Sequence, residues 1–374
     1  MSEKSMRRNR KRQRISLLTN IVFSLVTLTA LTGCIGLVLQ NYALKNESRQ
    51  TMGRLNELED YSSQHIYTQE EMDTFVREAA SSARETERES ILGGLKESVK
   101  NGESTVAILR ELYPEDVVVY ADGSYSFFPI TDELKKHNYN TENFVLQDNN
   151  EIAYIDDNPD TVSLKGVDVS RHQGTIDWRR VSGEDISYAF IRAGFRGNSE
   201  GKISEDEYFT DNIEGALDNG IDVGVYFYTQ ALDEEEAVEE AEFVLDLIEP
   251  YDVAYPVVLD LEEVGVDDAR TAQMTKADYT KAAVAFCETI KKAGYTPMIY
   301  GNLKTFMIML DMKQIEEYDK WFAYYDESVY FPYDFSIWQY SSEGAVNGIG
   351  GDVDMNVCMK DYAKGNQNHT ERGL

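Results

Sequence analysis

The hydrophobic pattern changes several times along the chain and divides it into segments. An uncharged run over residues 15–40 is followed by a polar, helix-prone stretch over residues 41–102. Within that stretch, Thr68 and Glu71 have the spacing of a capping box, and Asn101-Gly102 predicts the end of the helix. The apolar positions are too irregular to predict a coiled coil, so we expect a helical stalk of unknown oligomeric state.

Residues 103–160 have the pattern of a small α+β module or linker. Two apolar runs, VVVY (117–120) and YSFF (125–128), flank Asp122-Gly123. Apolar runs on either side of Asp-Gly predict a β-hairpin with a tight turn. The sequence leaves open whether this module contacts a substrate or only acts as a spacer.

Residues 161–364 alternate strand-like apolar runs with helical patterns. The strand-like runs are GVDVSRH (166–172), YAFIRAGF (188–195), DVGVYFYTQA (222–231), PVVLDLEEV (256–264), TPMIYGN (296–302), KWFAYYD (320–326), FSIWQYSS (335–342) and VDMNVC (353–358). The helical patterns cover residues 206–219, 233–249 and 275–293. Eight strands with interleaved helices predict an α/β fold, an irregular parallel (β/α) TIM-like barrel. The spacing shortens after residue 320, so we expect the last strands to lack proper helices, and residues 365–374 to form a flexible tail.

Charge changes the interpretation of the first segment. Residues 1–14 carry seven Lys or Arg and one Glu, whereas the whole chain has a net charge of −31. The uncharged run 15–40 is long enough to cross a bilayer, and its basic flank predicts a cytoplasmic N-terminus. We therefore expect a single-pass anchor in the cell membrane with the remaining chain outside. The alternative is a lipoprotein anchored at Cys34, because LTGC resembles a lipobox, but the apolar run continues beyond this cysteine.

Composition excludes several classes of function. The strong acidity argues against nucleic acid as a partner, since phosphate binding needs clustered Lys and Arg. His172 is the single histidine of the predicted barrel, so a multi-histidine metal centre is excluded and a Ser-His-Asp triad would depend on it alone. Phosphate loops and dinucleotide fingerprints are absent from the sequence, so we expect no cofactor and no metal. Catalysis by carboxylates alone remains.

Four acids interrupt strands that otherwise have a buried pattern. They are Asp168, Asp260, Glu262 and Asp354, all near the predicted C-terminal ends of strands one, four and eight. Residues i and i+2 of a strand face the same side, so Asp260 and Glu262 should both face the barrel axis, while Leu259 and Leu261 pack outward. Crowded carboxylates push each other's pKa values apart, which supplies the acid and the carboxylate that glycoside hydrolysis needs. A single acid at a strand end is more often solvated or caps the following helix. Four acids at the same end of the barrel favour an active site.

Aromatic residues near the strand ends suggest the class of substrate. Sugars present apolar C–H faces with polar rims, which suit aromatic platforms with nearby amides, although many strand aromatics belong to the core. The candidate substrate-binding residues are Tyr226, Tyr228, Tyr300, Tyr324, Trp338 and Gln339.

Several of these motifs, in this order, resemble the glycoside hydrolase family 25 muramidases, the Chalaropsis-type lysozymes. GVDVSRHQG is similar to the opening D-V-S strand of that family, VVLDLEEV to its D-x-E strand and IYGN to its fifth strand. WQYSS is similar to its W-Q-Y strand and GDVDMN to its closing V-D-x-N segment. The resemblance covers about residues 164–362.

The resemblance implies hydrolysis of the β-1,4 bond from N-acetylmuramic acid to N-acetylglucosamine in peptidoglycan glycan strands. It implies Glu262 as the general acid and Asp168, Asp260 and Asp354 as the other active-site carboxylates, with Tyr300 in the groove. We expect Asp260 to assist Glu262 by orienting the substrate's own N-acetyl group, with retention as the outcome. The resemblance itself leaves open which aspartate assists and what the stereochemical outcome is. The alternative function is a catalytically weak peptidoglycan-binding or scaffold protein that uses the same barrel.

Overall fold

The computed structural model describes residues 39–57, 68–147, 149–266 and 268–365. Contacts divide the chain into two compact units, residues 1–97 and residues 98–374. The predicted basic tail 1–14, most of the predicted membrane span 15–40 and most of the predicted tail 365–374 lie outside the described residues. Within the described ranges, no helix is both long enough and apolar enough to cross a membrane.

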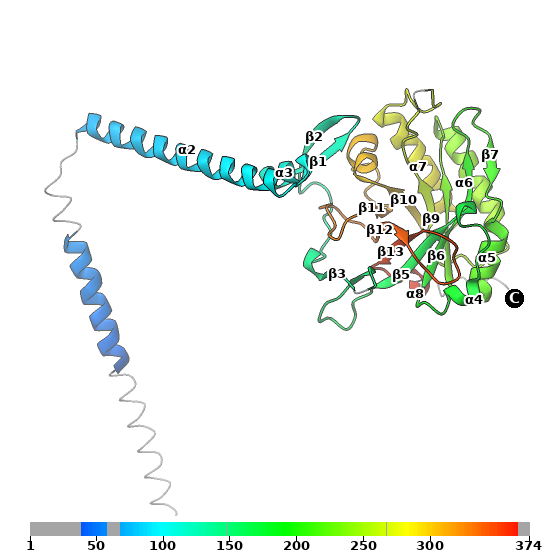
Figure 1. Cartoon of the computed structure of the whole chain (residues 1–374), viewed down its shortest axis with the longest axis horizontal. Coiled ribbons are helices and arrows are strands. Elements are labelled where there is room, and N and C mark those ends of the chain that lie inside the picture. Colours follow the sequence, from blue (N-terminus) through cyan, green and yellow to red (C-terminus); the bar gives the residue numbers. More distant parts are fainter. Residues whose placement is uncertain (1–38, 58–67, 148, 267, 366–374) are drawn as a thin grey trace, which may run out of the picture. The chain divides into compact units, whose positions relative to one another are not determined.

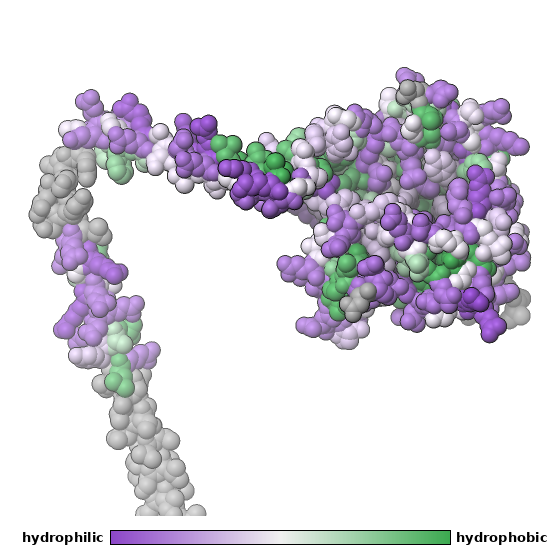
Figure 2. Space-filling view, in the orientation of Figure 1, coloured by the Kyte–Doolittle hydropathy of each residue, from purple (hydrophilic) through white to green (hydrophobic). Residues whose placement is uncertain are grey.

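The first unit is helical where it is described. Residues 39–57 form a helix, and α2 spans Gln69–Lys100. The predicted capping box is present, because the Thr68 and Glu71 side chains each accept a hydrogen bond from the other's backbone N–H. None of the side chains of α2 is buried. Hydrophilic residues cover most of this helix, with hydrophobic residues toward its C-terminal end (Figure 2).

The second unit contains a closed barrel of eight strands (Figure 1). The strands are β5 (Leu164–Val169), β6 (Tyr188–Arg196), β8 (Asp222–Tyr228), β9 (Val257–Asp260), β10 (Pro297–Gly301), β11 (Asp319–Ala323), β12 (Ile337–Gly344) and β13 (Val353–Cys358). Each pairs with the next, β13 pairs with β5 and so closes the barrel, and the short β7 (Ile203–Glu205) extends the sheet beside β6. The predicted TIM-like barrel is therefore confirmed.

The eighth strand runs in the opposite direction from the predicted one. β13 is antiparallel to both of its neighbours, β12 and β5. Only residues 345–352 connect β12 to β13, and a parallel crossover needs about a dozen residues or more. The connection is therefore a hairpin. Asp354 consequently lies near the start of its strand, not the end, yet at the same mouth as the carboxyl ends of the other strands.

Helices cover the outside of the first half of the barrel. α4 (Trp178–Val181), α5 (Phe209–Asp218), α6 (Glu234–Ile248) and α7 (Lys276–Lys292) follow β5, β6, β8 and β9 in turn. The three predicted helices correspond to α5, α6 and α7. After β10 there is only the single-turn π-helix η3 (Thr305–Met309), and β11 joins β12 without a helix. The prediction that the last strands lack proper helices is confirmed.

The residues before the barrel pack against this less covered side. They form α3 (Thr105–Leu112), the hairpin β1 (Asp116–Ala121) and β2 (Ser124–Pro129), the turn η1 (Thr141–Asn143) and the pair β3 (Phe144–Leu146) and β4 (Ile152–Tyr154). The predicted hairpin is confirmed, with Asp122 and Gly123 at positive φ in its two-residue loop. The ring of Phe144 meets that of Trp338 on β12 at 5.2 Å. Module and barrel thus share one core, and the predicted boundary at 160/161 falls inside the second unit.

Buried side chains form two layers, one outside the barrel strands and one in the barrel interior. The outer layer lies between strands and helices and includes Leu259 and Leu261, as predicted. The inner layer is largely aromatic: Phe190 stacks on Trp321 at 4.5 Å and Tyr188 stacks on Tyr255 at 4.6 Å. The barrel is therefore packed below its mouth, as is usual for this architecture.

We expect Phe144→Ala to lower the free energy of unfolding by about 3 kcal/mol, because the ring is 6% exposed and packs on Trp338. Val145→Ala is the matched control: this neighbouring side chain is 40% exposed, and its loss should cost less than about 0.5 kcal/mol. Urea unfolding followed by tryptophan fluorescence measures both. Equal midpoints for the two variants would show that the module is only a spacer.

Candidate active site

A cavity of about 490 Å³ opens at the mouth of the barrel. Its lining combines carboxylates, aromatic rings and amides. The lining residues are Asp168, Ser170, His172, Gln173, Arg192, Tyr226, Tyr228, Asp260, Glu262, Tyr300, Trp321, Tyr325, Gln339 and Asp354. All four acids that the sequence singled out are among them, so residues far apart in the chain meet at one place.

The barrel strands set the positions of these acids. Asp168 lies near the end of β5, Asp260 is the last residue of β9, and Glu262 follows two residues later on the same side. Asp354 is the direct partner of Asp168 in the antiparallel pairing of β13 with β5. Glu263 does not line the cavity and forms an ion pair with Lys304, which agrees with the predicted alternation.

A directed hydrogen-bond network holds Asp168. Its Oδ2 accepts from Gln339 Nε2 at 2.9 Å and from Asn356 Nδ2 at 2.8 Å. The amide oxygen of Gln339 accepts in turn from the hydroxyl of Tyr300 at 2.7 Å. Trp321 Nε1 donates to the amide oxygen of Asn356 at 2.7 Å. Both amides are therefore oriented to donate to Asp168, which has the geometry of a fixed acceptor.

Hydrogen bonds to backbone carbonyls fix the position of the Asp260–Glu262 segment. Thr229 N donates to the carbonyl of Asp260 at 3.0 Å, and Thr305 Oγ1 donates to the carbonyl of Leu261 at 3.1 Å. The side chain of Asp260 is buried, and its Oδ1 has no hydrogen-bond partner within the described part of the chain. A buried carboxylate oxygen without a donor is costly, so this atom is suited to accept a hydrogen bond from a ligand.

Burial raises the pKa of all four carboxyl groups. For Asp168 and Asp260 the pKa lies well above its ordinary range, with added repulsion from Asp354 and Glu262 respectively. The pKa of Glu262 is raised by burial and then by the charge of Asp354. Burial raises the pKa of Asp354 to about 6. Crowded carboxyl groups of this kind do not all ionise together near neutral pH, so some stay protonated.

Arg192 supplies a positive charge that the sequence analysis missed. Its Nε donates to Asp206 Oδ2 at 2.7 Å, and the Asp206 side chain is fully buried. Asp206 also accepts from the backbone N–H of Arg171 and Tyr208, so it is a fixed anchor. Arg192 lowers the pKa of Asp260, against burial and the neighbouring acids. Arg192 is the one charged residue in the apolar run YAFIRAGF, and strand alternation places it on the inward-facing side. This position could have identified it from the sequence.

The sequence profile described as Glycosyl hydrolases family 25 matches residues 167–349. YegX of Escherichia coli strain K12, an uncharacterized protein, is 31% identical over 210 residues, which cover 53% of this chain and 71% of YegX. The chain belongs to glycosyl hydrolase family 25. The predictions of this family and of a glycoside hydrolase are confirmed.

Two further proteins that this family 25 chain resembles have descriptive names. The autolytic lysozyme of Clostridium acetobutylicum is 24% identical over 193 residues, 51% of this chain and 55% of the relative. The modular autolysin LytC of Streptococcus pneumoniae, solved with a synthetic peptidoglycan ligand, has a TM-score of 0.48 and 24% identity. That match covers 65% of this chain and 56% of LytC, so this chain spans little more than half the length of either protein.

Of the six candidate substrate-binding residues, four line the cavity of the family 25 site and two do not. Tyr226, Tyr228 and Tyr300 line the cavity together with Gln339. Trp338 does not, because adjacent residues on a strand face opposite sides, and Gln339 takes the inward position.

Tyr324 also lies outside the cavity. Its ring stacks with that of Phe322 in the outer layer at 6.0 Å, and its hydroxyl accepts from Arg110. Trp321 and Tyr325 line the cavity instead, two aromatics that the sequence analysis assigned to strand six without naming them as site residues. Alternation along each strand could have separated the aromatics that line the cavity from those in the outer layer.

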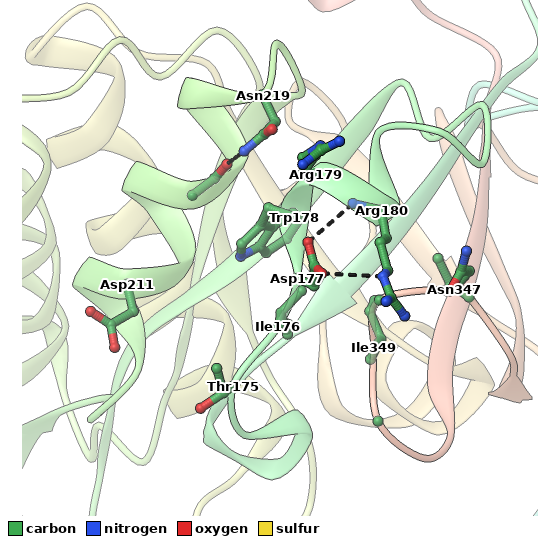
Figure 3. A pocket seen from close by; sticks show the side chains of 14 residues that line it. Thr175, Ile176, Asp177, Trp178, Arg179, Arg180, Asp211, Asn219, Asn347 and Ile349 are labelled. Atoms are coloured by element: carbon green, nitrogen blue, oxygen red, sulfur yellow. Dashed lines mark hydrogen bonds and ion pairs between the residues drawn. The ribbon is translucent and has the colours of Figure 1, made fainter.

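A larger depression of about 870 Å³ lies elsewhere on the surface, between the start of α4, one side of α5 and the β12–β13 loop (Figure 3). Its central acid, Asp177, caps α4 by accepting from Arg180 N and forms an ion pair with the Arg180 side chain. The carboxylate is thus already engaged, and no crowded acid pair lines this depression. No group of His, Cys, Asp or Glu in the described ranges is arranged to hold a metal ion.

We expect Asp354→Asn to raise the free energy of unfolding at pH 7 by on the order of 1 kcal/mol. The pKa of Asp354 is about 6 in the fold against 3.8 ordinarily, so the folded state binds this proton more tightly than the unfolded state does. Wild-type stability from this group is therefore lost as pH rises from about 4 through about 6. Urea unfolding at pH 4 and pH 7 measures the effect. A variant less stable than wild type at pH 7 would contradict it.

Proposed function

We propose that the protein is a muramidase that hydrolyses the β-1,4 bond from N-acetylmuramic acid to N-acetylglucosamine in peptidoglycan. The observation that carries this proposal is the meeting of Asp168, Asp260, Glu262 and Asp354 in one cavity with raised pKa values. The names of two family 25 relatives, an autolytic lysozyme and lysozyme M1 of Streptomyces globisporus, support this choice of substrate.

In this proposal Glu262 is the general acid. Burial and the nearby Asp354 raise its pKa, which favours the protonated form that a general acid needs. Glu262 gives its proton to the glycosidic oxygen as the bond to the anomeric carbon breaks. The ionised carboxylate then accepts a proton from the water that completes hydrolysis.

Asp260 has the complementary part. Burial and the charge of Glu262 raise its pKa, and the positive charge of Arg192 acts in the opposite direction. Once Glu262 is protonated, its repulsion is removed and Arg192 favours the ionised form of Asp260. Its Oδ1, which has no partner among the described residues, would accept a hydrogen bond from the N–H of the substrate's N-acetyl group and orient that group. The acetyl oxygen would then attack the anomeric carbon as the leaving oxygen departs, and water would open the resulting ring with net retention. Asp168, already holding two amide donors, would support the positive charge at the sugar ring.

We also propose that the protein is held at the cell membrane by residues 15–40, with residues 1–14 in the cytoplasm and the barrel outside. The support is the sequence alone: a basic segment directly before an uncharged run of membrane-spanning length. Such an anchor would confine hydrolysis to the wall close to the membrane. Lipid attachment at Cys34 would have the same effect.

We expect Glu262→Gln to reduce the clearing of a purified peptidoglycan suspension by roughly 10²–10⁴-fold, because it removes the transferable proton. Glu263→Gln is the matched control, since this neighbour faces away from the cavity and pairs with Lys304. It should retain activity within about threefold of the wild type.

Turbidity of the suspension follows the reaction, and pelleting the polymer measures binding. A wild-type protein that binds peptidoglycan without clearing it would instead support the scaffold alternative. Full clearing by Glu262→Gln would exclude this residue as the acid.

A further inference from the structure

The β1–β2 hairpin presents aromatic rings to solvent. Tyr120 and Tyr125 are direct partners across the hairpin, with ring centroids 4.7 Å apart, and Phe127 meets Tyr113 at 4.9 Å. Their exposed fractions are 56% for Tyr120, 38% for Tyr125, 41% for Phe127 and 47% for Tyr113. We call these four residues the aromatic face. Three of these rings lie on the hairpin and the fourth, Tyr113, is the C-cap of α3 just before it. Four exposed rings in two contacting pairs are unusual, because single exposed aromatics are the common case.

The opposite side of the hairpin is buried, so the aromatic face is held rigidly. Val117 and Val119 are almost fully buried in the core shared with the barrel. The hydroxyl of Tyr330, in the β11–β12 connection, accepts from Val118 N at 3.0 Å and donates to the carbonyl of Asp116 at 3.1 Å. The rings therefore lie on a fixed support and lose little conformational freedom when a ligand binds.

The tip of the hairpin reaches the segment that carries the proposed general acid. Lys304, three residues after β10, contacts Asp122 at 2.6 Å and also pairs with Glu263, the neighbour of Glu262. A groove of about 720 Å³ lies here and is lined by Asp122, Glu263 and Lys304 together with residues between 264 and 279. Figure 1 shows the hairpin beside the barrel, where these contacts place it. Lys304 therefore links the tip of the hairpin, at Asp122, to Glu263, the residue next to the proposed general acid.

The size of the catalytic cavity limits how much substrate it can hold. A volume of about 490 Å³ is typical of sites that enclose one drug-sized molecule. A glycan polymer must therefore continue over the rim of the barrel. Aromatic rings suit the C–H faces of sugars, and stacking on exposed rings tolerates small changes in register.

We propose that the aromatic face is an accessory binding surface for the glycan strand, which holds the polymer beside the catalytic mouth. This inference rests on the proposed function for its ligand, and it concerns residues outside the matched family segment 167–349. In this proposal the module of residues 103–160 contacts the substrate as well as completing the core, so it is more than a spacer. The aromatic face favours polymeric over short substrates.

The test replaces the three rings on the strands together, Tyr120→Ser, Tyr125→Ser and Phe127→Ser, in the full chain kept in detergent. In a Glu262→Gln background, pelleting with insoluble peptidoglycan should show an apparent Kd raised roughly tenfold. Phe75→Ser, which removes an aromatic of 68% exposure from α2, is the matched control and should leave Kd unchanged. Tyr120→Phe with Tyr125→Phe should also leave Kd unchanged, because rings rather than hydroxyls bind.

Activity separates this inference from the proposed function. With Glu262 intact, the triple variant should hydrolyse a soluble tetrasaccharide of alternating N-acetylglucosamine and N-acetylmuramic acid at the wild-type rate while clearing the insoluble polymer more slowly. Unchanged Kd for the polymer would overturn the inference and leave the proposed function intact. Loss of binding to phosphatidylglycerol vesicles instead of peptidoglycan would assign the aromatic face to the membrane. A wild-type protein inactive on the tetrasaccharide would overturn the proposed function alone.

Discussion

The antiparallel pairing of β13 with β5 closes the barrel, and the site depends on it. This pairing sets Asp354 directly opposite Asp168 and brings Asn356 within 2.8 Å of the Asp168 carboxylate. Closure also places β12 beside β13, so that Gln339 donates to the same oxygen. Without this last strand the mouth would be open on one side, and Asp168 would lose a carboxylate neighbour and an amide donor.

The closed mouth makes two neighbouring acids electrostatically different. Burial raises the pKa of both Asp260 and Glu262, but the positive charge of Arg192, which the buried Asp206 holds in place, opposes this increase at Asp260. Each carboxylate is buried at a cost in stability, as is common where function requires crowded charges. The aromatic layer beneath, with Phe190 stacked on Trp321, provides the rigid floor on which this charge pattern is held.

Most barrel strands and the four acids could be predicted from the sequence, because the alternation of inward- and outward-facing residues along a strand is a local property. Asp260 and Glu262 were placed correctly by strand parity alone. The direction of β13 could not be predicted from its own residues, since it depends on the length of the connection from β12. The role of Arg192 in the site could not be predicted, because a single basic residue in an apolar strand does not indicate its buried partner Asp206. Trp338 lies in the outer layer, which follows from its position next to the inward-facing Gln339. That the module replaces missing helices became visible only from contacts such as Phe144 with Trp338.

The identity of the new reducing end in digested peptidoglycan tests the central claim most directly. Hydrolysis from N-acetylmuramic acid to N-acetylglucosamine leaves the released reducing end on N-acetylmuramic acid. Borohydride reduction of the digest followed by mass spectrometry should therefore convert N-acetylmuramic acid to its alditol, in an amount that follows the loss of turbidity. Reduced N-acetylglucosamine as the main product, or clearing without new reducing ends, would contradict the account.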